Sequence, residues 1–328
     1  MTVLVTGGAG YIGSHMVWAL HDAGEAVVVI DNLSTGFDWA LPGDVPLVRG
    51  DIGDEALVAR VLSEHGVDAV IHFAGSIIVP ESVANPLKYY KNNTANSRSL
   101  IAACAAKGVD KFIFSSTAAV YGDPEIIPVP EDAPLKPVSP YGTSKLMTEM
   151  MLADVAAAHD FRYTALRYFN VAGADPRGRT GQSTAGATHL IKVAAEAALG
   201  KRAHLSVYGT DYPTEDGTAI RDYIHVADLV GAHALALERL RQGGDSAVMN
   251  CGYGHGYSVF EVIEAVRKVS GRPFETRMEA RRPGDSVRIV ADASRLRAEL
   301  GWQPRHDDLT EIVTHALAWE EKLAKRNS

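Results

Sequence analysis

Short runs of β-branched residues alternate with amphipathic segments through the first half of the chain. This alternation is typical of strand–helix–strand units that build a parallel sheet. Several of the runs are apolar throughout, as expected of strands that are covered by helices on both faces. The pattern predicts strands over residues 2–6, 26–30, 46–49, 69–73, 111–115 and 164–168. It predicts helices over residues 12–23, 55–65, 94–107 and 141–159.

The regularity of this pattern ends near Gly173. A polar, glycine-rich segment follows at residues 175–182, and we interpret it as a domain boundary. Beyond it the pattern predicts helices over residues 189–199, 226–241, 258–270 and 309–325, with short strands over 205–208 and 247–251. We therefore expect an α/β protein with a doubly wound sheet in residues 1–175 and a smaller α/β substrate-binding domain in residues 176–328. Short segments of the later chain are allowed to return to the first domain.

The composition narrows the classes of partner. Of the 328 residues 46% are hydrophobic and 22% charged, and the formal net charge of −8 argues against nucleic acid, because a phosphate backbone needs a basic face. Cys104 and Cys251 are the two cysteines, which is typical of a reducing compartment. The chain opens on a strand with no leader ahead of it, and no apolar run approaches the ~20 residues of a membrane span. We expect a cytoplasmic protein that binds neither nucleic acid nor membrane.

The first strand runs into a glycine-rich turn, Thr-Gly-Gly-Ala-Gly-Tyr-Ile-Gly, and a predicted helix follows. Glycines at positions 7, 10 and 13 permit a tight turn, a close approach of the backbone to a pyrophosphate, and close packing of helix on strand. The free N–H groups at the start of the helix then attract phosphate. The context on both sides predicts a Rossmann-type nucleotide site that includes Gly7, Gly10, Tyr11, Ile12 and Gly13.

Asp31 ends the second predicted strand. A carboxylate at this position accepts hydrogen bonds from the hydroxyls of an adenosine ribose and repels a 2′-phosphate. No arginine follows in the next four residues after Asn32, so the sequence favours NAD over NADP. The alternative is that Asp31 only caps a turn. Further along, the ends of the third and fourth strands are expected to face the cofactor through Asp51 and Ile52, and through Phe73, Ala74 and Gly75.

Ser139 and Pro140 are typical of the first residues of a helix, and they place Tyr141 and Lys145 one turn apart on the same face. A phenol has a pKa near 10, too high for an efficient base at neutral pH. A lysine ammonium one turn away, together with the charge of oxidised nicotinamide, would lower that pKa. The spacing alone is a common accident, but its place after the fifth strand of a dinucleotide fold favours a catalytic pair.

Three hydroxyl residues, Ser115, Ser116 and Thr117, follow the fifth strand at the sheet edge where ligands bind in open α/β folds. Together with a tyrosine they can move a proton to or from a sugar hydroxyl while hydride moves to nicotinamide. Turn capping is an equal alternative for Ser115 and Ser116. For Thr117 the position favours catalysis.

These segments together resemble the extended short-chain dehydrogenase/reductase family, and within it the 4-epimerases of UDP-glucose and UDP-galactose. The resemblance covers nearly the whole chain. It is carried by the glycine-rich turn, by Val-Ile-His-Phe-Ala-Gly from Val70, and by Phe-Ile-Phe-Ser-Ser-Thr-Ala-Ala-Val-Tyr-Gly from Phe112. Three later segments add to it: Ser-Pro-Tyr-Gly-Thr-Ser-Lys, Leu-Arg-Tyr-Phe-Asn, and Tyr-Pro-Thr-Glu-Asp-Gly-Thr-Ala-Ile-Arg-Asp-Tyr-Ile-His-Val from Tyr212.

The resemblance implies roles for individual residues. Tyr141 would be the acid/base, Lys145 would tune its pKa and bind a ribose, and Thr117 would bond the sugar O4. Further cofactor contacts would come from Asn32, Asn92, Ser115 and Tyr168, beside those named above. The UDP-sugar would be held by Asn170, His189, Leu190, Tyr208, Arg221, Arg282 and Asp285. Arginine suits the bidentate binding of phosphate, so an acidic chain can still hold a pyrophosphate.

The implied reaction is redox-neutral. Tyr141 takes the O4 proton as C4 gives hydride to bound NAD, the 4-keto sugar turns over, and the hydride returns to its other face. Ile77 stands where some members carry a lysine, and Thr117 where serine is usual. Ile289 falls where the family has a residue that limits the sugar pocket. Its intermediate bulk leaves UDP-N-acetylhexosamines and UDP-pentoses open as alternative substrates.

Two other functions are weighed against the epimerase. A nucleotide-sugar 4,6-dehydratase carries an acidic residue beside the active-site threonine, where this chain has Ala118 and Ala119. A non-catalytic NAD-binding module has no need to keep both Tyr141 and Lys145. The histidines, His225 included, show no metal-ligand spacing, so no metal is predicted. The resemblance also implies a homodimer through helices 94–107 and 141–159.

Overall fold

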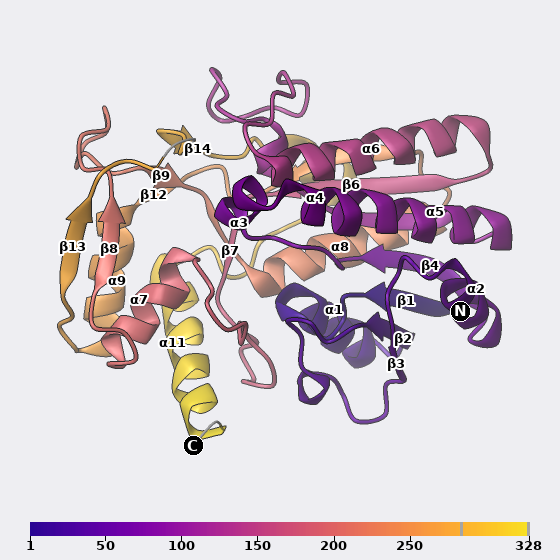
Figure 1. Ribbon diagram of the computed structural model, residues 1–328, viewed down its shortest axis with the longest axis horizontal. Helices are drawn as coiled ribbons and strands as arrows, with labels where there is room; N and C mark the ends of the chain where they lie inside the picture. The colour runs from indigo at the N-terminus through magenta and orange to yellow at the C-terminus, as the bar shows by residue number, and fades with distance from the viewer. Residues whose placement is uncertain (283–284, 327–328) are drawn as a thin grey trace.

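A sheet of seven parallel strands forms the centre of this computed structural model, which describes residues 1–282 and 285–326 (Figure 1). Its strand order is β11-β6-β5-β4-β1-β2-β3. The strands are β1 (Thr2–Thr6), β2 (Ala26–Asp31), β3 (Leu47–Arg49), β4 (Val67–His72), β5 (Lys111–Thr117), β6 (Arg162–Tyr168) and β11 (Ala247–Cys251). The chain winds outward from β1 in one direction through β2 and β3, and from β4 in the other. This confirms the expected doubly wound α/β class.

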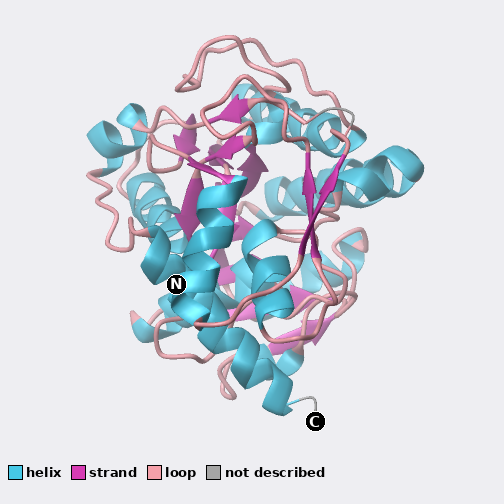
Figure 2. Ribbon diagram, turned by 90° about the vertical axis from the view of Figure 1, so that its left-hand side faces the viewer, coloured by secondary structure: helices cyan, strands magenta, loops and turns pink. Residues whose placement is uncertain are grey.

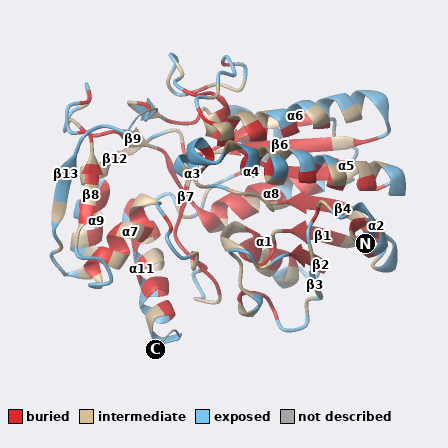
Figure 3. Ribbon diagram, viewed as in Figure 1, coloured by how far each residue is buried: buried red, intermediate tan, exposed pale blue. Residues whose placement is uncertain are grey.

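Helices cover both faces of the large sheet. Val3 and Val5 of β1 pack in one core with α1 (Tyr11–Asp22) and α8 (Val226–Arg241). Leu4, between them in sequence, packs in a second core with α2 (Glu55–Glu64), α5 (Asn96–Lys107) and α6 (Pro140–Ala158). Because successive side chains of a strand point to opposite faces, uniformly apolar strands require helices on both sides. Figure 3 shows the buried residues along the sheet and on the inner faces of these helices.

The later chain adds a second group of elements beside the carboxyl ends of the sheet. Its helices α7 (Leu190–Ala198), α9 (Val259–Ser270) and α11 (Leu309–Arg326) pack on one another. Figure 2 views the molecule from this side. Three small sheets join it: β8 (Leu205–Tyr208) with β13 (Thr276–Glu279), β7 (Asn170–Ala172) with β10 (Tyr223–His225), and β9 (Ile220–Arg221) between β12 (Tyr257–Ser258) and β14 (Arg288–Ile289).

The expected helices and strands of the first half are all present, with ends that differ by a few residues. The helix expected from residue 94 begins instead at Asn96, after the π-helical turn η2 (Tyr90–Ala95). The remaining elements that the pattern did not indicate are short, and few of them repeat a period. They are η1 (Asp38–Ala40), α3 (Val79–Ala84), α4 (Pro86–Tyr89), η3 (Ala118–Val120), α10 (Ser294–Leu300), and the strands β7, β9, β10, β12, β13 and β14.

Although the chain turns to the second group after β6, one strand and one helix of the later sequence lie on the large sheet. β11 pairs with β6 in parallel, Ala247 opposite Thr164, and α8 packs beside α1. The return completes the sheet edge and covers a face that α1 alone leaves open. Among the described residues no helix is long and apolar enough to cross a membrane.

Buried neutral histidines make this fold sensitive to acid. Burial lowers the pKa of His72, which lies between Thr6 and Ser97, from 6.5 to about 3, and the pKa values of His15 and His233 to about 4. Since the unfolded chain takes up these protons below pH 6.5 and the folded chain does not, stability is full above that pH and is lost as pH falls. Each histidine then costs about 2 kcal/mol at pH 5.

We therefore expect the melting temperature to fall steeply between pH 7 and pH 5, as checked by calorimetry across this range. His72→Asn, which keeps hydrogen-bonding groups but cannot gain a proton, should have a shallower slope. A melting temperature that is flat over the same range would contradict this account.

Candidate active site

The glycine-rich turn between β1 and α1 brings three backbone segments closer than any side chain would allow. Gly7 has φ +68°, and a Cβ built on it would lie 2.6 Å from the backbone nitrogen of Ala74 at the end of β4. A Cβ on Gly13 would lie 2.1 Å from the carbonyl oxygen of Gly7. Helix α1 begins after Gly10 with no side-chain cap. The uncapped N–H groups and the bare backbone fit a pyrophosphate.

Asp31 lies at the carboxyl end of β2 and lines the same cavity as the turn. Its two oxygens accept backbone hydrogen bonds from Ala9, at 2.9 Å, and from Leu33, at 2.7 Å. Burial raises the pKa of this carboxyl, and the two hydrogen bonds oppose that rise. The bonds also hold the carboxylate in one orientation. This arrangement fits the ribose hydroxyls of NAD and repels an additional phosphate.

One cavity of about 980 Å³ joins the glycine-rich turn to the second group of elements. It brings together most of the residues that the sequence singled out. On the cofactor side these are Gly7, Gly10, Tyr11, Ile12, Gly13, Asp31, Asn32, Asp51, Ile52, Phe73, Ala74, Gly75, Asn92 and Tyr168. On the other side they are Thr117, Tyr141, Asn170, His189, Leu190, Tyr208, Arg221, Arg282 and Asp285.

Ser115 and Lys145 do not line this cavity but lie directly behind it. The Lys145 ammonium donates to the carbonyl oxygen of Ser115 at 2.9 Å and lies 4.8 Å from the centre of the Phe114 ring. The Ser115 hydroxyl donates to the Tyr168 hydroxyl at 2.8 Å. Both residues therefore act on the cavity through the groups in front of them, unless a ligand opens a path between these groups.

Tyr141 and Thr117 meet in the middle of the cavity. The Ser139 hydroxyl caps α6 by accepting from the backbone of Gly142 at 3.2 Å, and Pro140 occupies the first helical position. This local sequence starts the helix one residue before Tyr141, so that the phenol faces the end of β5. The Thr117 hydroxyl accepts from the backbone of Ala119 at 3.1 Å, which fixes its rotamer.

The protein alone does not lower the pKa of the Tyr141 phenol. Burial raises it, and the neighbouring Thr117 hydroxyl acts in the opposite direction. Burial also lowers the pKa of Lys145 from 10.5 to about 8. The downward shift expected for Tyr141 from Lys145 and nicotinamide is thus not supplied by the chain. A second positive charge in the cavity is needed to bring the phenol into its working range.

The second group of elements supplies two arginines to the far end of the cavity. The Arg282 guanidinium lies 3.8 Å from the centre of the Tyr208 ring, and its Nε is 3.9 Å from a carboxylate oxygen of Asp285. Arg221 donates to the carbonyl oxygen of Ile220 at 2.9 Å, which fixes the guanidinium at the cavity wall. Two guanidinium groups beside an aromatic ring fit a nucleoside diphosphate.

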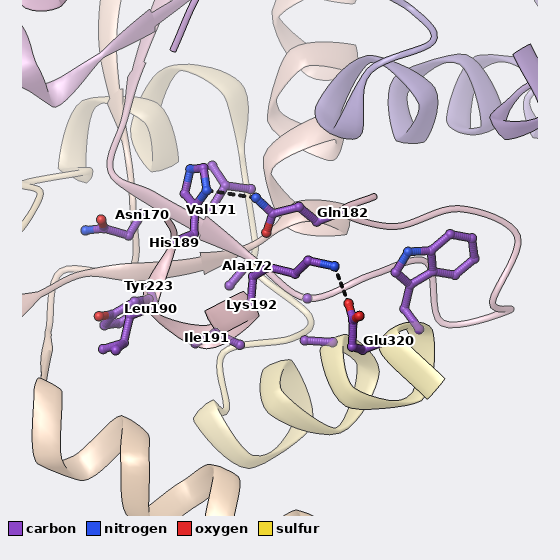
Figure 4. A pocket seen from close by; sticks show the side chains of 13 residues that line it. Asn170, Val171, Ala172, Gln182, His189, Leu190, Ile191, Lys192, Tyr223 and Glu320 are labelled. Atoms are coloured by element: carbon purple, nitrogen blue, oxygen red, sulfur yellow. Dashed lines mark hydrogen bonds and ion pairs between the residues drawn. The ribbon is translucent and has the colours of Figure 1, made fainter. Parts of the chain in front are cut away.

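His189 is held by a partner that the sequence did not indicate. Gln182 Nε2 lies 2.8 Å from His189 Nδ1, and since the amide donates, the imidazole carries its own proton on Nε2 (Figure 4). Burial lowers the pKa of His189, which keeps the ring neutral. Behind this pair lies a smaller cavity of about 50 Å³, where Lys192 of α7 forms an ion pair with Glu320 of α11.

Several residues that line the main cavity were not predicted as site residues. Gln182, Thr184 and Thr188 come from the loop before α7, and Ser206, Val259 and Ser286 lie near the arginines. Apolar residues Val79, Val83 and Val138 lie at the rim. Of these, only the polar loop at 175–182 had a signal in the sequence, because a glycine-rich segment after a strand end is a frequent binding loop. The others occur on short elements with no distinctive pattern.

Among the described residues one group of side chains has the spacing of a metal site: His225, His306 and His315, whose ligand atoms lie within 4.8 Å of one another. The hydrogen bonds assign them another role. His225 Nδ1 accepts from the backbone of Ala227 at 3.0 Å, so its proton is on Nε2, which donates to His315 Nδ1 at 3.0 Å. A protonated Nε2 cannot bind a metal ion, and the three rings join α8 to α11.

The geometry described above defines a dinucleotide-dependent enzyme with a nucleotide-sized second site, and the comparisons agree. The chain belongs to the NAD dependent epimerase/dehydratase family, whose model matches residues 3–252. NAD is its cofactor, as the sequence predicts.

Individual relatives are more specific. A UDP-glucose 4-epimerase of Azospirillum brasilense is 61% identical over 321 residues, 98% of this chain and 92% of that protein. The crystal structure of UDP-glucose 4-epimerase from Brucella ovis in complex with NAD is 45% identical, with a TM-score of 0.94 over 97% of each chain. The enzyme from Bifidobacterium longum in complex with NAD+ and UDP is 40% identical, with a TM-score of 0.93 over 98% of each chain.

Two glycine substitutions in the turn should separate folding from cofactor binding. Gly13→Ala places a methyl group against backbone atoms that cannot move aside, so we expect it to destabilise the protein by about 2–4 kcal/mol. At Gly10 the nearest atom to a new Cβ is 3.2 Å away, and the methyl group points into the cavity. Gly10→Ala should therefore fold with a nearly unchanged melting temperature but retain less NAD.

The NAD content after purification and the melting temperature of each variant measure these two effects. Equal loss of NAD without any loss of stability in Gly13→Ala would contradict the packing argument.

Proposed function

We propose that this protein is a 4-epimerase that interconverts UDP-glucose and UDP-galactose with tightly bound NAD. One observation carries the proposal. A single cavity places Tyr141 and Thr117 between a glycine-rich dinucleotide cradle and a pair of arginines. The relatives named above are UDP-glucose 4-epimerases, which supports the same reading.

NAD fits the cofactor side of the cavity through residues with distinct tasks. The turn at Gly7, Gly10 and Gly13, followed by Tyr11 and Ile12, receives the pyrophosphate, and Asp31 and Asn32 receive the adenosine ribose. Asp51 and Ile52 lie beside the adenine, and Phe73, Ala74, Gly75, Asn92, Ser115 and Tyr168 form the wall toward the nicotinamide. When bound, NAD supplies a reversible hydride acceptor and the positive charge that Tyr141 requires.

Tyr141 removes the proton of the sugar O4 and later returns it. Thr117 donates a hydrogen bond to the same oxygen and holds it within reach of the phenol. Lys145 keeps a positive charge behind the phenol and fixes the end of β5 through Ser115. Since Tyr141 and Lys145 are buried, the proton is exchanged inside the cavity and not with bulk water.

The nucleotide anchors the substrate while the sugar turns. Arg221 and Arg282 hold the two phosphates, Tyr208 stacks near the uracil, and Asp285 accepts from its ribose. Asn170, His189 and Leu190 complete this end, with His189 donating through Nε2. Strong contacts at the nucleotide and few at the sugar allow a 4-keto sugar to present its other face.

The size of the sugar pocket leaves a related 4-epimerase of UDP-N-acetylhexosamine or UDP-pentose as the second candidate. Ile289 lines the cavity, and Val79 and Val83 at the rim leave an apolar side on which an acetyl group would fit. A 4,6-dehydratase is disfavoured because Ala118 and Ala119, which follow Thr117 along the cavity wall, carry no acid.

The assembly and setting of the enzyme are part of the proposal. We infer a homodimer through α5 and α6, on whose outer surface Met147 and Met150 are 42% and 59% exposed. Two free cysteines, Cys104 and Cys251, both buried, support a cytoplasmic location and a role in galactose metabolism.

The purified protein, given UDP-galactose with no added NAD, should form UDP-glucose. Tyr141→Phe removes the acid/base and should lower kcat by about 10²–10⁴. Tyr212→Phe is a matched control, because that buried hydroxyl has no hydrogen-bond partner among the described residues and should leave kcat unchanged. Chromatography of the two UDP-sugars measures both.

No conversion by the wild-type protein, even after NAD is added, would remove the epimerase function. Full activity of Tyr141→Phe would remove only the assigned base. A parallel assay with UDP-N-acetylgalactosamine decides between the two candidate substrates.

A further inference from the structure

A buried ion pair lies directly behind the active site and has no part in the mechanism above. Glu149 of α6 and Arg167 of β6 are 5% and 4% exposed. The guanidinium donates to the carboxylate three times, from Nε at 3.0 and 3.2 Å and from Nη2 at 2.6 Å. Two buried charges cost several kcal/mol of desolvation each, so such a pair is weak evidence for stability and calls for another explanation.

Glu149 is on the same face of α6 as the catalytic pair. Tyr141, Lys145 and Glu149 follow one another at intervals of four residues, one helical turn each. The carboxylate is therefore the next charged group behind the Lys145 ammonium. It is a source of negative charge beside a cation that burial disfavours.

The same carboxylate also fixes the strand that carries Thr117. The Ser116 hydroxyl, fully buried, donates to Glu149. Because side chains alternate along β5, Ser116 points toward α6 while Thr117 on the next residue lines the cavity. Glu149 thus holds the end of β5 from behind, at the residue beside the one proposed to bind the substrate.

The other partners of Arg167 extend this arrangement to the sugar side of the cavity. Arg167 Nη1 donates to the Tyr121 hydroxyl at 2.9 Å, and Tyr121 donates to Asn250 at 2.7 Å. Asn250 in turn donates to the carbonyl oxygen of Val129, which pairs with Ala291 just after Ile289. The ion pair is therefore connected on both sides to walls of the cavity.

The groups that face Lys145 come from every element packed against it. From α6 these are Tyr141 and Glu149, and from β4 the neutral His72, whose pKa the Lys145 charge lowers further. Phe114 and the Ser115 carbonyl face it from β5, and Asn93 lies beside it from η2 across Gly75. Arg167 on β6 is the cation nearest to Glu149. In this set Glu149 supplies the negative charge.

We propose that Glu149 is a positioning residue of the epimerase site, which fixes the end of β5 through Ser116 and keeps the Lys145 ammonium charged. The proposal rests on the function argued above. It assigns Arg167 the task of neutralising and orienting Glu149. The carboxylate acts only through Ser116 and Lys145 and does not touch the substrate.

Glu149→Gln tests the electrostatic part, because it keeps the shape of the side chain and removes its charge. Burial already lowers the pKa of Lys145 to about 8, and loss of the carboxylate lowers it further. The alkaline limb of the kcat profile for UDP-galactose should move down by about 1 pH unit. Nuclear magnetic resonance of the Lys145 Cε carbon, assigned with Lys145→Arg, should show the same shift without any turnover.

Two further variants serve as controls. Ser116→Ala keeps the charge and breaks the hydrogen bond, so it should lower kcat, leave KM unchanged and leave the Lys145 titration in place. Glu320→Gln removes another buried, ion-paired carboxylate, which does not line the cavity of Tyr141. It should match Glu149→Gln in loss of melting temperature but not move the alkaline limb.

If the wild type epimerises and Glu149→Gln leaves both the alkaline limb and the Lys145 resonance in place, Glu149 is merely structural and the proposal is overturned. Unchanged kcat in Ser116→Ala would overturn the strand-fixing part. Should Glu149→Gln not fold, the variant Glu149→Leu/Arg167→Met removes both charges, a change that buried pairs often tolerate. It should show the same downward shift, and an unmoved Lys145 titration in it would again overturn the proposal.

Discussion

The ammonium group of Lys145, only 3% exposed, is the constraint on which the rest of the site depends. A buried cation is stable only if its donors are used and its charge is balanced. The carbonyl of Ser115 and the ring of Phe114 use the donors, and the carboxylate of Glu149 balances the charge. Each of these partners is at or near the end of β5. The position of α6 on the sheet is thereby fixed, and with it the position of Tyr141.

The same burial explains why the enzyme needs its cofactor for more than hydride. The chain alone raises the pKa of Tyr141, so the phenol becomes an effective base only when a second cation is present. The catalytic group is thus inactive until the glycine-rich cradle is filled. At the other end, an acidic protein concentrates two arginines where a pyrophosphate lies, which separates the anchoring of the nucleotide from the chemistry at the sugar.

Most of the large sheet could be predicted, because its strands are apolar on both faces and its helices are long enough to repeat their period. The glycine-rich turn, Asp31, Tyr141 and Thr117 could be predicted because each occupies a strand end or a helix start. Strands such as β9 and β14, of two residues each, have no period. Gln182 and Glu149 were missed because their roles depend on His189 and Ser116, which are distant in sequence and meet only in the fold.

The central claim is that the hydrogen at C4 leaves and returns inside a closed pocket while Tyr141 handles the O4 proton. Conversion of UDP-galactose to UDP-glucose in heavy water, followed by mass spectrometry of the product, tests this most directly. The account predicts that the product carries no deuterium on carbon at C4. Deuterium at C4 would show that this hydrogen exchanges with solvent, and would contradict the account.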